Sequence, residues 1–442
     1  MTITIIGGTD GLGKWFARYL KNKGYDVIVT GRDKVKGKNV EKEIGVKYIS
    51  DNIEGTKMGD VVIVAVPINV SEKVIREIGP YVKENGLFMD ITSIKEIPAK
   101  AMEESVREGV CVIPTHPMFG PSIPSLKRQV VILTPSEKHK NNPWFRKVLD
   151  FLNNEGAKVI ITSPMEHDKI MGVVQGLTHY AYISLGITLK DLNIDIKKSR
   201  EYASPIYELM INIIGRIIGQ NPYLYADIQM HNPQIKHIHE TFIKECETIK
   251  DIVNRKDREG FVKLMKDAAR HFGNETVRGL NYSDKAVNAI SAELEKIKKS
   301  IGREVGFRHV HSNNVHYGIV KDVLGDYVIL DKNGKELKIN IGNVNIMDDE
   351  ELNEWKNKNL KKYNYDISFL FKKDVDENII LKLLKGRFNV DIIDVYSGSN
   401  IPENYKSITF RITDYDKDKL EKIKDEFIYV VKNIGGTVRY GK

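Results

Sequence analysis

The segment TIIGGTDGLGKW, residues 4–15, lies between a short apolar run and an amphipathic one. A glycine-rich turn that leaves a strand and opens a helix is the setting of a loop that binds a dinucleotide. Its glycines would serve the tight turn, a close approach of the backbone to a pyrophosphate, and close packing of the helix on the strand; they are Gly7, Gly8, Gly11 and Gly13. The amide groups at the helix N-terminus, with Thr9 and Leu12 beside them, would then face the phosphates.

The spacing of this loop differs from the standard GxGxxG pattern. It is closer to the GGTGxxG loops of NADP-linked reductases, with Asp10 at the place of a glycine. A carboxylate so close to phosphates is unfavourable unless its side chain points outward. The loop therefore predicts a nucleotide site together with an outward orientation of Asp10.

The second apolar run ends in VIVTGRD, residues 27–33. A site for NAD normally ends this strand with Asp or Glu, which binds the ribose hydroxyls. Thr30 occupies that place and Arg32 follows, and an arginine there suits the 2′-phosphate of NADP. We therefore favour NADP over NAD as the cofactor. Val66 and Pro67, at the end of a further apolar run, complete the expected cofactor contacts.

Residues 1–162 alternate short apolar runs with amphipathic segments such as Leu12–Lys23 and Ser71–Tyr81. This is the βαβ rhythm of a doubly wound sheet. We therefore predict an α/β Rossmann domain here. Its expected strands are Thr2–Ile6, Asp26–Thr30, Val61–Val66, Leu87–Ile91, Val110–Pro114, Val130–Thr134 and Lys158–Ile161.

Residues 163–302 change to helical periodicity with almost no strand signal. The segments between 166 and 220 are apolar nearly all round, which indicates burial within a domain or between subunits. We predict an all-α domain that binds substrate and joins two copies of the chain in a homodimer. The expected helices are Glu166–Leu189, Lys197–Gln220, Pro233–Asn254, Arg258–Arg270 and Asp284–Lys299.

The remainder of the chain returns to strand patterns. Residues 303–350 predict a small β unit with strands Val315–Val320, Tyr327–Asp331 and Glu336–Ile341, followed by a charged helical linker, Asp348–Lys362. Residues 360–442 predict the order β-α-β-β-α-β of a ferredoxin-like domain. ACT domains, which regulate biosynthetic enzymes by binding amino acids, share that order. The expected elements are Ile367–Phe371, Glu377–Leu384, Val390–Tyr396, Ser407–Ile412, Lys417–Asn433 and Thr437–Tyr440.

Composition limits the classes of function. With 442 residues, 41% of them hydrophobic, the chain can form several cores, yet it has no apolar run long enough to span a membrane. Cys111 and Cys246 form no CxxC pair, so we expect a cytoplasmic protein with no metal. The net charge of +8 favours anionic substrates, and nucleic acid is not an expected partner.

Two segments of the α/β region place polar side chains where chemistry is expected. THPMFGP, residues 115–121, puts His116 at the C-terminal end of a predicted strand, where α/β sheets bind ligands. Histidine is the side chain best suited to move a proton near neutral pH. DITSIKEIP, residues 90–98, puts Ser93 and Lys95 after another strand on the same edge of the sheet.

Two segments of the helical region add to this set. EHDKIMGVVQGLTHYAY, residues 166–182, carries His179 on a long helix. SPIYELMINIIGRIIGQNPYLYADI, residues 204–228, places Arg216 inside an apolar helix. A buried arginine requires an anionic partner, so Arg216 should face one.

Over residues 1 to about 275 the chain resembles the prephenate dehydrogenase family of tyrosine biosynthesis. The resemblance rests on TSIK, on HPMFGP, on EHD followed by a helical histidine, and on SPIY, GR and LYADI in the same order. It implies hydride transfer from prephenate to NAD(P)⁺ with loss of carbon dioxide, giving 4-hydroxyphenylpyruvate. The chain has the features of an archaeal member with an additional C-terminal extension.

The same resemblance implies a role for each candidate residue. His116 would accept the proton of the substrate hydroxyl, and Ser93 would hydrogen-bond the same hydroxyl. Arg216 would bind a substrate carboxylate. The further substrate contacts implied are His179, Lys95 as a general cation, and Tyr225 from either subunit.

Alternatives stay open at this point. Ser93 and Glu96 form an S-x-x-E pattern, so Ser93 could instead cap a helix. Arogenate, which carries an amino group where prephenate carries a keto group, would give tyrosine directly. Two further alternatives are another NADP-linked reductase and a regulatory or nucleic-acid-binding protein on a Rossmann core. Neither alternative explains why the chain carries both His116 and Arg216. For the C-terminal domain, tyrosine as a feedback effector is the working hypothesis.

Overall fold

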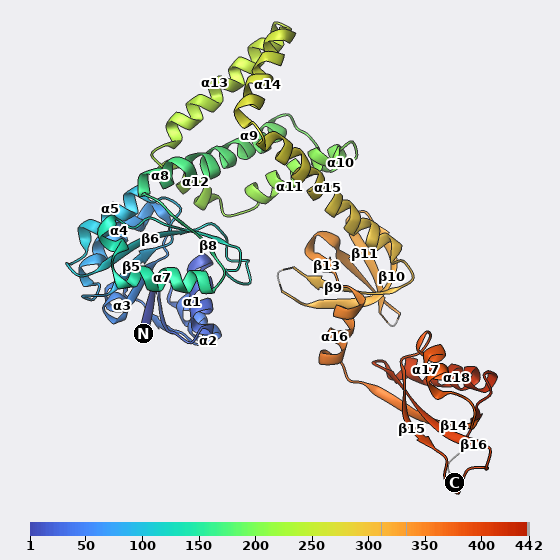
Figure 1. Cartoon of the computed structure of the whole chain (residues 1–442). Coiled ribbons are helices and arrows are strands. Elements are labelled where there is room, and N and C mark those ends of the chain that lie inside the picture. The colour runs from blue at the N-terminus through green and yellow to red at the C-terminus, as the bar shows by residue number, and fades with distance from the viewer. Residues whose placement is uncertain (311, 333, 440–442) are drawn as a thin grey trace. The chain divides into compact units, whose positions relative to one another are not determined.

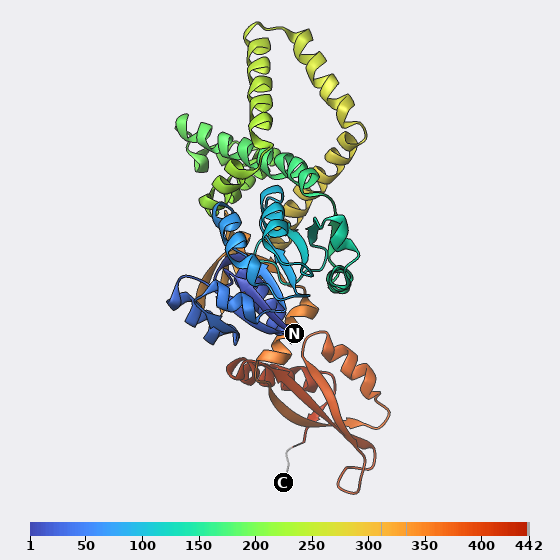
Figure 2. The ribbon, with the colours of Figure 1, turned by 90° about the vertical axis from the view of Figure 1, so that its left-hand side faces the viewer.

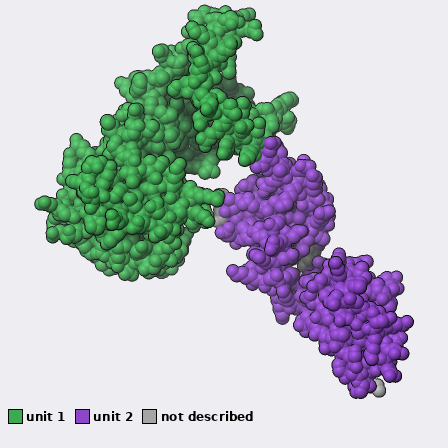
Figure 3. Space-filling view, viewed as in Figure 1, with its two compact units in different colours: residues 1–287 green, residues 288–442 purple. Residues whose placement is uncertain are grey.

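The computed structural model describes residues 1–310, 312–332 and 334–439. The chain divides into two compact units, residues 1–287 and 288–442 (Figure 3). The division falls inside one helix, α15 (Glu275–Lys299). Ile297, near the end of that helix, packs in the core of the first sheet of unit 2. The structure therefore places this boundary earlier in the chain than the expected residue 302.

Unit 1 begins with an eight-stranded sheet in the order β3-β2-β1-β4-β5-β6-β7-β8. Neighbouring strands are parallel except for β6 and β7. The strands are β1 Thr2–Ile6, β2 Asp26–Thr30, β3 Lys47–Ile49, β4 Val61–Val64, β5 Leu87–Asp90, β6 Cys111–Pro117, β7 Val130–Leu133 and β8 Lys158–Ile161. The helices around the sheet are α1 Gly11–Asn22, α2 Lys34–Ile44, α3 Asn52–Met58, α4 Ile68–Ile78, α5 Glu96–Ser105, α6 Glu137–Lys140 and α7 Pro143–Asn154 (Figures 1 and 2).

Both faces of this sheet are buried. Alternate residues of β1 belong to different cores, with Ile5 in one and Ile6 in the other. The same holds for β4, whose sequence VVIV is buried throughout. A strand buried on both faces is apolar along its whole length, which is why the sequence pattern located it. The doubly wound α/β domain that the sequence predicts is confirmed.

β4 ends at Val64, two residues before the expected Val66, and two further strands differ from their predictions. The expected list missed β3, because three residues between amphipathic segments carry little periodicity. β6 continues three residues beyond the expected Pro114, to Pro117, and includes His116. The extension arises because β6 pairs with β7 on its other side, with His116 opposite Ile132.

The helical part of unit 1 follows the predicted pattern with four differences, one of which is that α15 begins at Glu275 and not at the expected Asp284. A π-helical turn, Gly172–Leu177, interrupts the first long helix. Ser204 and Pro205 begin a new helix inside the expected second one, and Asn221 caps a further helix that was not expected. Figures 1 and 2 show α13 and α14 as a pair standing away from the sheet. The helices are α8 Pro164–Met171, α9 Thr178–Asp191, α10 Ile196–Arg200, α11 Pro205–Ile218, α12 Pro222–His231, α13 Ile235–Asn254, α14 Arg258–Phe272 and α15.

Unit 2 contains two antiparallel sheets. The first has the order β12-β11-β10-β9-β13 and includes two strands not expected, β9 and β13. The second has the order β15-β16-β14-β17, and its elements follow one another as β-α-β-β-α-β, as the sequence predicts. The last expected strand shortens to β17, and Tyr440 lies outside the described residues. The bounds are β9 Glu304–His309, β10 Val315–Leu324, β11 Tyr327–Lys332, β12 Lys335–Asn340, β13 Val344–Ile346, α16 Asp349–Asn359, β14 Tyr363–Lys372, α17 Glu377–Lys385, β15 Val390–Tyr396, β16 Tyr405–Asp414, α18 Lys417–Asn433 and β17 Thr437–Val438.

Candidate active site

The candidate residues of the α/β domain meet at one edge of the sheet. Register pairs Ile6 with Val64, Val64 with Asp90, and Asp90 with Pro114 on successive parallel strands. The segments that follow these positions therefore leave the same carboxyl edge. They carry the glycine loop, Val66 and Pro67, Ser93 and Lys95, and His116, as the sequence predicts.

The glycine loop has the tight geometry that its sequence implies. Gly7 has φ +83°, and a Cβ atom there would lie 2.6 Å from the carbonyl oxygen of Ala65. A Cβ atom on Gly13 would lie 2.7 Å from the carbonyl oxygen of Gly7, so the helix α1 packs directly on the turn. Side chains at either position would push this turn apart. The first-turn amide groups of α1, including those of Leu12 and Gly13, are thereby held at the carboxyl edge.

Asp10 points away from the loop, as the sequence requires of it. Its carboxylate is 73% exposed, accepts the N–H of Gly11 at 2.8 Å and pairs with Lys36 Nζ at 2.7 Å. The hydrogen bonds from Lys36 and Gly11 lower the pKa of Asp10. The negative charge next to the loop is therefore paired with a cation in the resting structure.

The two cofactor residues expected at the end of β2 differ in whether their side chains are exposed to a cofactor. Thr30 is fully buried and its hydroxyl donates to Asn52 Oδ1 at 2.7 Å, so the expected contact of its side chain with a cofactor is not supported. Arg32 is exposed at the start of the following turn. Gly31 is packed under Thr9, whose Oγ1 would lie 2.6 Å from a Cβ atom there. The glycine loop and Arg32 thus fit a dinucleotide at this edge.

His116 is the central side chain of the site. It is 2% exposed, and its Nδ1 lies 2.9 Å from Nε2 of His167 on α8. His167 in turn has its Nδ1 2.7 Å from Asp168 Oδ1. Burial first, and then the proximity of His167 and Lys95, hold the pKa of His116 well below its usual range. The ring of His116 is therefore neutral near pH 7.

Ser93 is not a helix cap. Helix α5 begins at Glu96 with Lys95 as its N-cap residue. The amide groups of Lys95 and Glu96 donate instead to the two oxygens of Asp168, at 2.7 and 2.9 Å. The capping-box alternative is wrong, because a carboxylate from α8 occupies that position. Ser93 is half-buried in the loop between β5 and α5.

The side chain of Lys95 is buried inside the protein and does not face the substrate region as expected. Its side chain is 0% exposed and its ammonium donates to Asp90, to Thr92 Oγ1 at 3.1 Å and to the carbonyl of Thr115 at 2.8 Å. All three ammonium protons therefore have acceptors within the protein. The expected general contact of Lys95 with substrate is not supported. The side chain instead ties the loop after β5 to β6, one residue before His116.

The helical domain brings a second group of candidates together. The rings of His179 and Tyr225 meet edge to face with centroids 4.6 Å apart. Burial raises the pKa of Tyr225, and the positive charge of Arg216 opposes that rise, so Arg216 lies close to Tyr225. Within one chain, Tyr225 therefore reaches His179 without a second subunit. Arg216 is exposed, which corrects the expectation of a buried arginine.

Gln175 connects the two groups. It lies in the π-helical turn, one turn before His179, and its Nε2 is 3.5 Å from Nε2 of His116. Among the described residues, Gln175 Oε1 and His179 Nδ1 are two of three buried side-chain polar atoms with no hydrogen-bond partner. Buried polar atoms are normally paired, so these two indicate where a ligand would bind.

Sequence reasoning missed four residues of the site: Asp90, His167, Asp168 and Gln175. The motifs EHD and DITSIK contain three of them, but a motif does not say which atoms meet. The sequence carried a partial signal in His167 and Asp168. Two neighbouring ionisable residues near the start of a helix are rarely both buried unless they have partners.

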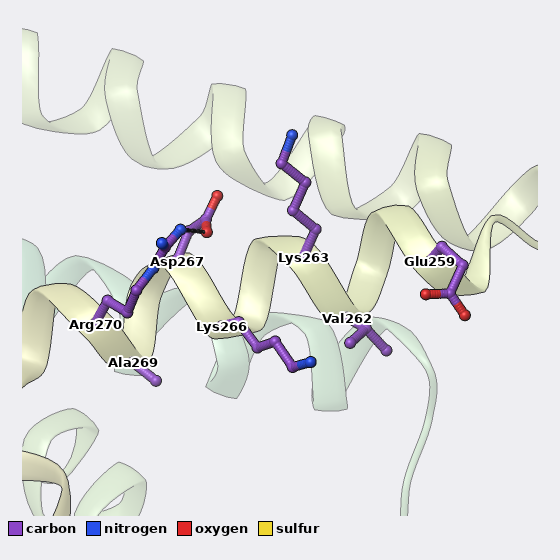
Figure 4. A pocket seen from close by; sticks show the side chains of 7 residues that line it. All are labelled: Glu259, Val262, Lys263, Lys266, Asp267, Ala269 and Arg270. Atoms are coloured by element: carbon purple, nitrogen blue, oxygen red, sulfur yellow. Dashed lines mark hydrogen bonds and ion pairs between the residues drawn. The ribbon is translucent and has the colours of Figure 1, made fainter.

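A hollow elsewhere on unit 1 has no such chemistry. It measures about 600 Å³ and is lined by residues of α14 (Figure 4). Its lining mixes basic and acidic side chains, with Lys263, Lys266 and Arg270 beside Glu259 and Asp267, and Arg270 pairs with Asp267. It contains none of the residues around His116. Among the described residues, no group of three or more His, Cys, Asp or Glu could hold a metal ion, and no helix is long and apolar enough to cross a membrane.

Comparisons with known proteins show the family of the chain. A family model described as the nucleotide-binding domain of prephenate dehydrogenase matches residues 16–161, and one described as its dimerization domain matches residues 163–267. A probable arogenate/prephenate dehydrogenase of Methanocaldococcus jannaschii is 66% identical over 440 residues, 100% of this chain and 99% of the relative. The T-protein of Haemophilus influenzae is 32% identical over 281 residues, 64% of this chain and 70% of that protein.

A solved structure shows the same fold for unit 1. Prephenate dehydrogenase of Aquifex aeolicus, in complex with hydroxyphenyl propionate and NAD⁺, has a TM-score of 0.51 and 20% identity, covering 61% of this chain and 96% of that one. The family matches, on a fold with a dinucleotide loop at the sheet edge, define an oxidoreductase that uses a nicotinamide cofactor. The chain belongs to the prephenate dehydrogenase family. Its C-terminal unit lies beyond the family models and is shared with the relative from M. jannaschii.

Proposed function

We propose that the chain oxidatively decarboxylates prephenate to 4-hydroxyphenylpyruvate in tyrosine biosynthesis. The observation that carries this proposal is a neutral, buried histidine, His116, at the same edge of the sheet as a dinucleotide loop. Loss of hydride from a carbinol carbon requires a base for the hydroxyl proton, and His116 Nε2 is available for it. No covalent nucleophile is needed, because aromatisation of the ring drives the loss of carbon dioxide.

The nicotinamide, when bound, supplies the hydride acceptor. The chain's own residues supply the rest. His116 takes the proton of the 4-hydroxyl at Nε2, and Ser93, on the adjacent loop, hydrogen-bonds the same oxygen. Arg216 binds a carboxylate of the substrate, and His179, Tyr225 and Gln175 surround the side chain. Exclusion of water by these groups strengthens each of the charged contacts.

Assay of the purified chain tests the activity directly. Prephenate or arogenate is mixed with NADP⁺ or NAD⁺, and the reduced cofactor is followed by its absorbance. We expect turnover with prephenate, and a kcat lower by about 10²- to 10⁴-fold in a His116→Asn variant. Turnover with arogenate alone would replace prephenate with arogenate as the substrate; the name of the M. jannaschii relative includes both. No turnover with either substrate would contradict the proposal.

We propose NADP as the preferred cofactor because Arg32 is exposed at the end of β2 and Thr30 offers no carboxylate for a ribose. Lys36 lies on the first turn of α2, paired with Asp10, and adds positive charge nearby. An Arg32→Ser variant should raise KM for NADP⁺ by about tenfold and leave KM for NAD⁺ nearly unchanged. A wild-type preference for NAD⁺ would show that Arg32 does not bind a 2′-phosphate.

The helical domain is proposed to form a homodimer. It carries large apolar side chains that one chain leaves exposed, including Leu185, Ile187, Ile206 and Ile218. Helix α9 has no buried residue at all. Exposed apolar surface on this scale marks an interaction site. Analytical ultracentrifugation should give twice the chain mass, and a monomer at micromolar concentration would contradict the proposal.

The C-terminal unit is proposed as a regulatory module that responds to tyrosine. Its β-α-β-β-α-β order is the supporting observation. A truncation should end at residue 287, because Leu294 and Ile297 of α15 pack on the first sheet of unit 2. The truncated enzyme should lose inhibition by tyrosine. If inhibition persists, tyrosine acts on the catalytic unit instead.

A further inference from the structure

A line of hydrogen bonds extends behind His116 through two residues of α8. His116 Nδ1 lies 2.9 Å from His167 Nε2, and His167 Nδ1 lies 2.7 Å from Asp168 Oδ1. All three side chains are buried. Asp168 is itself fixed from the other side, because its two oxygens accept the amide N–H groups of Lys95 and Glu96. The carboxylate therefore has little freedom to rotate.

These contacts determine which ring nitrogen carries each hydrogen. The oxygens of Asp168 act as acceptors toward two backbone amides, so the hydrogen between Asp168 and His167 is on His167 Nδ1. A neutral His167 then has its lone pair on Nε2 and accepts from His116. His116 accordingly carries its hydrogen on Nδ1 and has its lone pair on Nε2. That nitrogen faces Gln175, on the side where the helical domain brings His179.

We propose that His167 and Asp168 are positioning residues that hold His116 in the Nδ1–H tautomer and share the positive charge that His116 acquires. This inference rests on the proposed function, in which His116 is the base. The proton leaves the substrate hydroxyl and binds His116 Nε2. The Nδ1–H of the resulting imidazolium donates more strongly to His167 Nε2, and the single positive charge of the pair faces Asp168. Neither side chain gives or takes electrons.

The charges around the pair agree with this arrangement. Lys95 on the N-terminal side of α5 disfavours a charged His167, whereas Asp168 on α8 and Asp90 on β5 favour it. Burial is the largest cause that lowers the pKa of each ring. Both rings are therefore neutral at rest, which the tautomer argument requires. Asp168 supplies the compensating charge once a proton arrives.

Close packing alone does not require polar side chains at the positions of His116, His167 and Asp168. An aromatic ring without nitrogen would fill the same volume as His167 and would not bury a polar group that needs partners. The Glu103–His139 pair offers a comparison within the same chain. His139 is also buried and contacts a carboxylate at 3.2 Å, but it does not touch His116.

Three variants of the full-length chain test the proposal. His167→Phe keeps the ring and removes the acceptor for His116 Nδ1–H. His167→Gln retains an amide oxygen that can accept that hydrogen but cannot take up a proton. His139→Gln is the matched control, since it removes a buried histidine paired with a carboxylate outside this line. Each is compared with the wild type for kcat, for KM of both substrates and for thermal stability.

We expect kcat to fall by about 10²- to 10⁴-fold in His167→Phe; the upper limit is the loss of about 10⁴ found when a catalytic histidine is left in the wrong tautomer. His167→Gln should lose about tenfold, because the acceptor remains. KM should stay within about threefold in both, since neither side chain touches substrate. His139→Gln should keep its kcat. A His167→Phe enzyme with kcat within about twofold of wild type would overturn the proposal.

A tautomer measurement covers the case in which His167→Phe does not fold. With ¹⁵N-labelled histidine, the Nε2 signal of His116, assigned through His116→Asn, should show an unprotonated nitrogen in the wild type at pH 7. In His167→Gln the same tautomer should persist, whereas a protonated Nε2 in the wild type would overturn the proposal. This result is independent of turnover. If the wild type turns over neither substrate, the proposed function fails even where the tautomer is as expected.

Discussion

Removal of the Lys95 ammonium should destabilise unit 1 strongly, because it leaves Asp90 as a buried charge without a counter-charge. Lys95 and Asp90 are both 0% exposed. In Lys95→Met, Asp90 would retain the N–H and O–H of Thr92 and the N–H of Thr115 as donors. Breaking a buried pair costs about 3–5 kcal/mol. The remaining donors place the expected loss near 3 kcal/mol, equivalent to about 6–12 °C in Tm for a domain of this size.

Scanning calorimetry measures this loss, with the transition of unit 1 identified as the one that NADP⁺ shifts upward. The double variant Asp90→Asn with Lys95→Met removes both charges and should recover more than half of the lost Tm. It tests the physical reason, since the cost lies in the unpaired charge rather than in the lost contact. A Tm loss below about 2 °C in Lys95→Met, or a double variant less stable than the single one, would refute the reasoning.

The remaining predictions concern catalysis. His116→Asn should lower kcat by about 10²- to 10⁴-fold with little change in KM, and near-normal kcat would end its assignment as the base. Arg216→Ala should mainly raise KM, by about 30-fold or more, since bound substrate would bury its carboxylate against Arg216 and truncating one side of a buried charge pair costs about 2–5 kcal/mol; an unchanged KM would contradict its contact with a carboxylate. The pKa of His116 is held below 6.5, and only the neutral ring accepts a proton, so kcat should stay level from pH 8 to 6.5 and fall only as the pH drops further. A midpoint at or above pH 6.5 would show that the ring is not buried in the active enzyme.

The sequence located the elements whose pattern is local. The glycine loop lies between a strand and a helix, and the close approach of Gly13 to Gly7 lies within that one βα turn, although Gly7 and Gly8 also pack against Ala65, just after β4, and Val29 of β2. The buried strands of the α/β domain are apolar along their length, so they are visible in any short window. His116 could be placed at the carboxyl edge because parallel strands bring their C-terminal ends to one side.

The same local reasoning failed where a distant residue changed the outcome. Ser93 and Glu96 form a plausible capping box, yet Asp168 reaches the helix start from more than seventy positions away. From its sequence position, Lys95 is a cation that could bind substrate. In the structure its ammonium is buried and donates to Asp90 and to the carbonyl of Thr115. The apolar residues around Arg216 in the sequence predict that it is buried. In the structure its position on α11 leaves its side chain exposed.

By itself, then, the sequence determined the α/β class, the nucleotide loop and the edge that carries His116, because these follow from periodicity and from the geometry of single βα turns. Tertiary structure alone decided how His116 is held. His167 lies 51 residues from it along the chain, and the contact exists only because α8 packs against the loop after β5. Hydrogen bonds between distant segments depend on how whole elements pack, and no window of sequence contains that information.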